Sequence, residues 1–194
     1  MSAPALSAPA RRKLGIASQT TSSDDVVRRL FAALTPLHEL GEHDSELLTR
    51  AAAGHRFIRA MQPFGSKERS LMRIALADLP ATEAFVVVAA SSYAADTSLQ
   101  DELGAWDRLL QADRRRIMWF AAILRLAESI AAVCANRATP IHVAWTDEVL
   151  YLEIDGVALS VRDTERVLGR AAAIEAATDR RVLFTSSARR RGAA

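Results

Sequence analysis

The chain has a single cysteine, Cys134, among its 194 residues, so no disulfide bond can form within it. Cys134 ends an alanine-rich apolar segment, which predicts a small buried side chain. No apolar run reaches the roughly 18 residues that a membrane-spanning helix needs. The basic residues 11–13 are not followed by the apolar core of a signal peptide. We therefore expect a cytoplasmic protein without a membrane partner.

Several motifs that define catalytic or metal-binding classes are absent. The sequence has no glycine-rich phosphate loop, no zinc-type cysteine cluster, no HExxH and no GxSxG. The formal net charge is only +2, which is too small to predict a specific nucleic-acid partner. Among the 25 basic residues only Lys13 and Lys67 are lysine. Arginine binds phosphate in a bidentate manner that lysine cannot match, although a G+C-rich genome produces the same bias.

Composition divides the chain into four parts. Residues 1–22 are rich in Ala, Ser, Pro and Thr, so they cannot bury enough apolar surface to offset the entropy of ordering, and we expect a disordered tail. Residues 23–138 read as a helical bundle and 139–187 as a small α/β subdomain. Residues 188–194 form a second, basic tail.

Candidate caps and breakers divide the bundle into helices. The predicted helices run from Ser23 to Gly41, from Ser45 to Pro63, from Ser66 to Pro80, from Thr82 onward, and from Asp113 to about Asn136, with a short helix and turn over 99–110. Gly41 stands where a C-capping glycine is expected. The run Phe85–Val88 has strand propensity, but its neighbours keep helical spacing, and we predict a helix.

The pattern changes after Pro140. Residues 141–145 and 149–154 alternate in polarity as strands do, and Asp155-Gly156 is a tight-turn signal. A helix then starts at Asp163 or Thr164, and residues 182–185 form a last strand. The fold class is therefore α+β, mostly α, with a helical bundle followed by a small β-β-α-β unit.

The long predicted helix places a carboxylate in an apolar stripe. Ile117, Ala121, Leu124 and Glu128 fall on one face at helical spacing. An isolated buried charge is costly, so Glu128 should have a partner or border a cavity. His55 also lies on an apolar helix face, and a His55–Glu128 pair would satisfy both groups without a metal.

Two other histidines are expected to be solvated: His43 in a polar turn and His142 on the outer face of a strand. A group of arginines brackets the start of the long helix and could bind phosphates: Arg108, Arg114, Arg115, Arg116 and Arg125. The alternative is that residues 114–116 form an exposed turn paired with Asp107 and Asp113.

Three segments together resemble a known family. Residues 30–41, residues 47–55 and the run Ile-Leu-Arg-Leu-Ala-Glu at 123–128, followed by the small β unit, are similar to the C-terminal half of the exopolyphosphatase / guanosine pentaphosphate phosphatase (Ppx/GppA) family. The resemblance covers roughly residues 24–187. It implies an HD-domain-like helical bundle and a small α/β segment. It also implies that phosphohydrolase chemistry belongs to actin-like domains, which this sequence does not contain.

The departures from the family pattern fall on its metal ligands. Where the family has a His-Asp or His-Glu pair, this chain has His55-Arg56, and a cation beside the histidine should repel a divalent metal. A family His-Ser pair corresponds to Arg69-Ser70, a further histidine corresponds to Ala94, and an aspartate is replaced by Glu128. The resemblance therefore implies a vestigial HD site (His55, Arg56 and Glu128) without the several ligands of a binuclear metal centre.

Three functions follow from these observations. The first, which we favour, is a non-catalytic or regulatory module that binds polyphosphate or a phosphorylated nucleotide and has no catalytic residue, cofactor or metal. The second is a phosphohydrolase of exopolyphosphatase type with His55, Glu128 and Asp96 as ligands. The third is a separately encoded subunit that completes an actin-like phosphatase; a second copy of the chain, forming a homodimer, is another candidate partner. In that case Trp106, Trp119 and Phe120 would be interface anchors, unless the last two are plain core.

Overall fold

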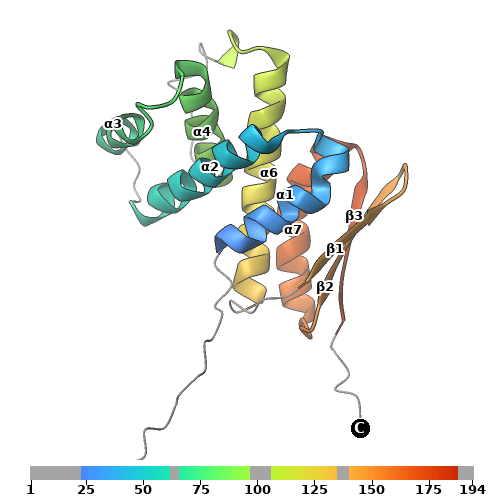
Figure 1. Ribbon diagram of the computed structural model, residues 1–194. Coiled ribbons are helices and arrows are strands. Elements are labelled where there is room, and N and C mark those ends of the chain that lie inside the picture. The colour runs from blue at the N-terminus through green and yellow to red at the C-terminus, as the bar shows by residue number, and fades with distance from the viewer. Residues whose placement is uncertain (1–22, 62–65, 97–105, 135–139, 188–194) are drawn as a thin grey trace, which may run out of the picture.

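The computed structural model describes residues 23–61, 66–96, 106–134 and 140–187. Helices come first and a small sheet follows, so the predicted α+β, mostly α fold class is confirmed (Figure 1). The elements are α1 (Ser23–His38), α2 (Glu42–Ala60), α3 (Ser66–Ala75), α4 (Ala81–Ala94), α6 (Gln111–Val133), β1 (Ile141–Trp145), β2 (Val149–Asp155), α7 (Val161–Thr178) and β3 (Arg181–Ser187). The two predicted tails, residues 99–105 of the predicted short helix and turn, and the predicted helix end at Asn136 lie outside the described residues.

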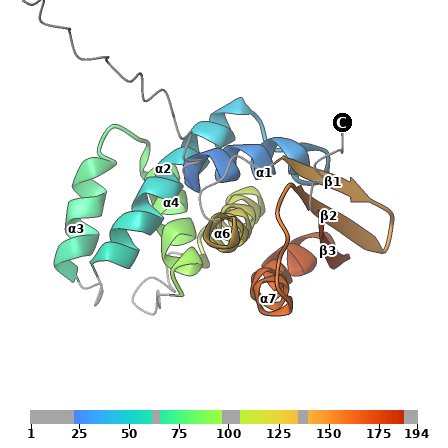
Figure 2. The same ribbon diagram turned by 90° about the horizontal axis from the view of Figure 1, so that it is seen from below.

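Helix α6 is the centre of the molecule. It contacts α1, α2, α4 and α7, and Figure 2 shows it nearly end-on with these helices around it. Residues 119–124 are buried without a break. Because successive residues of a helix point about 100° apart, this unbroken buried run shows that the middle of α6 is covered on every side. None of the described helices is both long enough and apolar enough to cross a membrane.

The sheet has the order β1-β2-β3, with β1 antiparallel to β2 and β3 parallel to β2. A parallel pair needs a crossover connection, and α7 supplies it. Leu150, Leu152 and Ile154 form the buried face of β2. Helix α7 contacts both α6 and β3, while α1 contacts both α6 and β1. The sheet and the helices therefore share one hydrophobic core.

The α1–α2 corner differs from the sequence prediction. Gly41 does not end α1; Glu39 takes the left-handed conformation there, with φ of 59°. Gly41 is instead the N-cap of α2, where its N–H donates to Asp44 Oδ2 at 3.0 Å. Helix α2 thus starts at Glu42, three residues before Ser45, the predicted cap.

Two other helix starts also precede their predicted caps. Helix α6 begins at Gln111, so that Asp113 lies inside its first turn. In α7, Ser160 Oγ accepts from Asp163 N at 3.1 Å, which makes Ser160 the cap and Asp163 a first-turn residue. Acidic residues are favoured both at caps and in first turns, where the helix dipole attracts them. Residue type alone therefore does not fix the first helical residue.

Residues 85–88 lie within α4, so their predicted helical conformation is confirmed, and the helix begins at Ala81 rather than Thr82. Val86, Val87 and Val88 are all buried. This burial outweighs the strand propensity of a valine run. Cys134 is buried as expected.

His38 closes the end of α1 from within the core. It is only 1% exposed, and its ring packs against Phe31 and Trp119, with centroids 4.4 and 5.5 Å away. Leu40 N–H donates to Nδ1 at 2.9 Å, so the proton must sit on Nε2, which donates to Phe31 O at 2.9 Å. Protonation would place a second hydrogen against the Leu40 N–H. Burial lowers the pKa of His38, even though the Phe31 carbonyl and Asp44 favour the charged form.

This arrangement predicts that the fold loses stability in mild acid. Because the pKa of His38 is lower folded than unfolded, its contribution is complete above about pH 6.5 and is lost as pH falls toward the folded value. The free energy of unfolding should fall by up to about 1.4 kcal/mol per pH unit for each such group. Urea unfolding between about pH 7 and pH 5 should give a smaller slope for His38→Gln than for the wild type. An equal slope in both proteins would contradict this role for His38.

Candidate functional site

Helices α2 and α6 cross so that His55 and Glu128 lie beside each other, as the sequence predicted. His55 faces inward because it shares a helical face with Leu48, Ala51 and Ile58, which are buried in the bundle core. The two side chains border an open cavity of about 420 Å³. We call it the His55 cavity; its ionisable lining residues are His55, Arg56, Arg59 and Glu128.

His55 has an unused hydrogen-bonding atom. Its side chain is 7% exposed, and Nε2 is buried without a hydrogen-bond partner among the described residues. The Glu128 Oε2 atom lies 3.8 Å from Nε2, which is beyond hydrogen-bond range. The expected pair is therefore close in space but not hydrogen-bonded. A buried polar atom left in this state is costly.

Two guanidinium groups complete the His55 cavity. Arg59 Nη2 lies 3.3 Å from Glu128 Oε1, and Arg56 is hydrogen-bonded to Asp24 in the first turn of α1. Arg56 thus lines the cavity, with α1 holding its side chain in place. The sequence analysis missed Arg59 and Asp24. Arg59 lies one helical turn after His55, a spacing that could have been noticed, whereas no local pattern links Asp24 to Arg56.

Burial is the main cause that favours the neutral ring of His55. Burial lowers the pKa of His55, and the guanidiniums of Arg59, Arg56 and Arg125 lower it further, while the Glu128 carboxylate acts in the opposite direction. A neutral imidazole has one nitrogen that donates and one that accepts. The cavity wall therefore holds two fixed cations, one carboxylate and an adaptable polar ring.

These residues do not fit a binuclear metal centre. Within the described ranges, no group of three or more His, Cys, Asp or Glu side chains could hold a metal ion. Asp96 therefore does not join His55 and Glu128 as the third ligand that the phosphohydrolase alternative requires. Ala94, where the resemblance implies a histidine in the family, is buried in α4. A binuclear site needs several convergent ligands, and here arginines stand beside the one histidine.

The predicted arginine patch is divided in space. Arg125 lies nine residues after Arg116 on α6, which is about 13 Å along the helix axis. Arg116 binds two aspartates, with Nε 2.9 Å from Asp44 and Nη1 3.2 Å from Asp113. The structure therefore brings one part of the patch to the first turns of α6 and leaves Arg125 apart, bound to the Tyr93 carbonyl and Asp96.

The other arginines at the start of α6 have separate surroundings. Arg114 donates to the Asp107 carbonyl at 3.0 Å and lies over the Trp106 ring at 6.0 Å. Arg115 Nη2 is 3.8 Å from Glu39 Oε2. Arg108 borders a shallow pocket. The alternative interpretation was that residues 114–116 pair with Asp107 and Asp113. The Arg116–Asp113 ion pair agrees with it.

Arg125 takes part in a clasp between helices. Its Nε donates to the Tyr93 carbonyl at 3.0 Å, and its Nη2 binds Asp96 just beyond the end of α4. Arg170 of α7 reaches the other Asp96 oxygen at 2.8 Å. The Arg170 hydrogen bond, together with the charge of Arg125, lowers the pKa of Asp96. One carboxylate thereby joins α4, α6 and α7.

The aromatic candidates for an interface separate into two groups. Trp119 and Phe120 are 2% and 0% exposed, so they belong to the core and are not available as interface anchors. Trp106 is half-buried against Tyr93, with ring centroids 5.7 Å apart. His43 and His142 are exposed as expected, and each lies near a carboxylate, Glu83 at 3.0 Å and Asp155 at 3.1 Å respectively.

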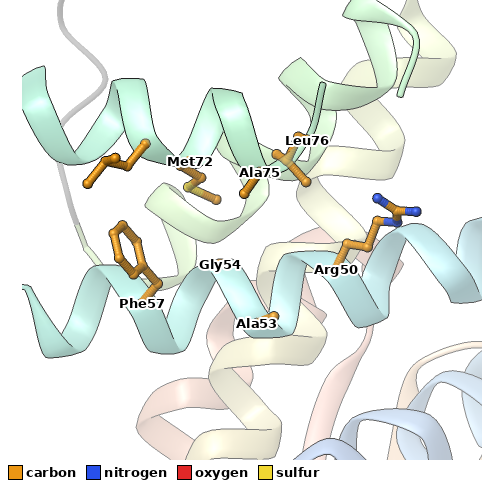
Figure 3. Close-up of a pocket in the computed structure, with 8 residues that line it drawn as sticks. Arg50, Ala53, Gly54, Phe57, Met72, Ala75 and Leu76 are labelled. Carbon is orange, nitrogen blue, oxygen red and sulfur yellow. The ribbon is translucent and has the colours of Figure 1, made fainter. Parts of the chain in front are cut away.

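A second hollow, of about 330 Å³, is an apolar groove between α2 and α3 (Figure 3). Phe57 and Met72 face each other across it, and Arg50 stands at one end, paired with Asp78 at 2.7 Å. Gly54 forms the floor. An added Cβ at Gly54 would collide with the end of Met72 and lie 2.7 Å from Ser91 Oγ.

No protein-family model matches the chain, and no curated protein matches it either. The functional argument therefore depends on the geometry of the described side chains. Of the His55 cavity and the α2–α3 groove, only the His55 cavity is lined by charged groups of opposite sign together with an unsatisfied buried nitrogen.

The Asp96 clasp predicts a measurable electrostatic contribution. Asp96→Asn keeps a residue that tolerates the left-handed φ of 56° but removes the charge. The free energy of unfolding at neutral pH should fall by about 0.5–1 kcal/mol, as expected for partly exposed ion pairs. Asp179→Asn is the matched control, because Asp179 has φ of 55° and no ion pair among the described residues. Equal losses in the two variants would contradict the clasp.

Replacement by alanine should destabilise the fold at Gly54, in the floor of the groove, and stabilise it at Gly169. In Gly54→Ala the added methyl meets Met72 and Ser91, and Ser91 is held by bonds to the Ala51 and Val87 carbonyls. Overpacking of this kind costs about 1–3 kcal/mol. In Gly169→Ala of α7 the methyl has open space and should stabilise by about 0.5–1 kcal/mol. Chemical unfolding of both variants tests the difference, and a stabilised Gly54→Ala would show that the close approach is not limiting.

Proposed function

We propose that this protein is a non-catalytic module that binds polyphosphate or a phosphorylated nucleotide. In this proposal it is an HD-like helical domain related to the C-terminal half of the Ppx/GppA family, acting in the cytoplasm. The observation that supports it best is the composition of the His55 cavity. Two arginines and one histidine border it, where a hydrolase of this type would present carboxylate and histidine ligands to a metal.

The chemistry of the cavity favours anions over cations. Guanidinium groups match the oxygens of phosphate in a bidentate geometry and keep their charge at every physiological pH. Arg59 is half-exposed, so its guanidinium can meet a ligand from solvent. A divalent cation would face two positive charges and a single carboxylate. The two arginines thus disfavour a catalytic metal and favour a phosphate-bearing ligand.

The arginines at the start of α6 offer a second contact region for a long ligand. Arg115 is half-exposed, and its 3.8 Å distance to Glu39 is longer than a direct hydrogen bond. Exposed pairs of this kind contribute little to stability, so a polyanion can compete for the arginine. A chain of phosphates, unlike a single phosphate, has the length to reach both regions.

A binding titration tests the proposal against the phosphohydrolase alternative. The purified chain should bind polyphosphate at about 50 mM salt and clearly more weakly at about 200 mM, because charges in solvent are screened over a shorter distance at higher salt. It should release no phosphate, and metal analysis should find no stoichiometric Mn, Fe or Zn. Turnover abolished by His55→Ala would establish the alternative. Absence of binding at low salt would refute the proposed function.

A further inference from the structure

The Glu128 carboxylate lies in the His55 cavity, beside the groups that would bind an anion from solvent. It lies between the two helices, with Oε1 3.3 Å from Arg59 Nη2 and Oε2 3.8 Å from His55 Nε2. Its side chain is 36% exposed, so it can turn toward solvent without crossing the core. With the Arg59 guanidinium beside it, this carboxylate acts as an internal ligand of the site.

The internal ligand fits the site incompletely. The carboxylate reaches Arg59, yet it leaves the buried Nε2 of His55 without a hydrogen bond. A carboxylate is planar and has one charge. A phosphate group has more acceptor oxygens in a tetrahedral arrangement and up to two charges. It therefore offers separate oxygens to Arg59, Arg56 and His55, which all line the cavity.

We propose that the His55 cavity is a subsite for a single phosphate group, and that Glu128 occupies this subsite when no phosphate is bound. The inference deepens the proposed function and rests on it, because it names the terminal phosphate of the ligand as the group recognised. Arg59 and Arg56 are the guanidinium donors, and His55 Nε2 is the third donor. Binding moves the Glu128 carboxylate outward, away from His55 and Arg59.

The charged groups that face His55 come from both packed helices. Arg56 and Arg59 are on α2, while Glu128 and Arg125 are on α6. When a phosphate replaces Glu128 beside the ring, the imidazolium gains a more strongly charged anionic neighbour. Phosphate should therefore raise the pKa of His55 from its lowered value in the free protein, and, by linkage, protonation of His55 should tighten binding.

The decisive variant is Glu128→Gln, probed with inorganic phosphate. If Glu128 competes with the ligand, loss of its charge should tighten phosphate binding on the order of tenfold, since a carboxylate at about 6 Å repels a dianion even in water. Glu165→Gln removes the same charge from an exposed position on α7 and is the matched control. Unchanged or weaker phosphate binding by Glu128→Gln overturns the subsite.

Two further measurements locate the phosphate. The His55 ring resonances should shift on phosphate addition, and the pKa read from their pH titration should rise. Arg59→Ala and Arg56→Ala should each weaken phosphate binding at least about tenfold, a typical effect of removing a charged hydrogen-bond donor. Arg166→Ala, an exposed arginine on α7, should leave binding unchanged. Thermal unfolding of each variant verifies that it is folded.

The outcomes separate this inference from the proposed function. If polyphosphate binds the wild type but Arg59→Ala and Arg56→Ala bind it equally well, the proposed function stands and the subsite is refuted. If phosphate shifts no His55 resonance while polyphosphate binds, the subsite is likewise refuted. If neither probe binds at low salt, both proposals fall.

Discussion

The structure depends on the burial of the middle of α6, where residues 119–124 are covered on all sides. A polar side chain that leaves this stretch toward the bundle needs a partner on a neighbouring helix. Arg125 finds Tyr93 and Asp96 at the end of α4, and Glu128 lies beside Arg59 and His55 of α2. These contacts fix which faces of the surrounding helices turn toward α6. The His55 cavity is one result of this constraint.

Periodicity made the central features predictable. The stripe through Glu128 and the alternation over 141–154 were sufficient to predict a buried helix, a small β unit and a carboxylate that needs a partner. His55 could be matched to Glu128 because both interrupt apolar faces. Contacts between exposed residues could not be read in the same way. Asp24 meets Arg56 across 32 residues and Asp96 meets Arg170 across 74, and nothing in the local sequence of either pair identifies the other.

The helix ends show a different limit of sequence reasoning. Gly41 was expected to end α1, yet Glu39 adopts the left-handed conformation and Gly41 begins α2. The residue before Glu39, His38, is anchored by hydrogen bonds to Phe31 and Leu40, which hold the chain at this corner. Which residue takes the left-handed conformation is therefore set by tertiary packing, and the propensity of a single residue does not predict it.

The two cations of the His55 cavity are both arginines, and this choice has a consequence for control in the cell. Enzymes that acylate lysine have no substrate in the cavity, so acetylation cannot neutralise its positive charge. Guanidinium also does not lose its proton in alkaline conditions. The imidazole of His55, whose pKa is lowered by burial, is left as a lining group that gains a charge as the pH falls.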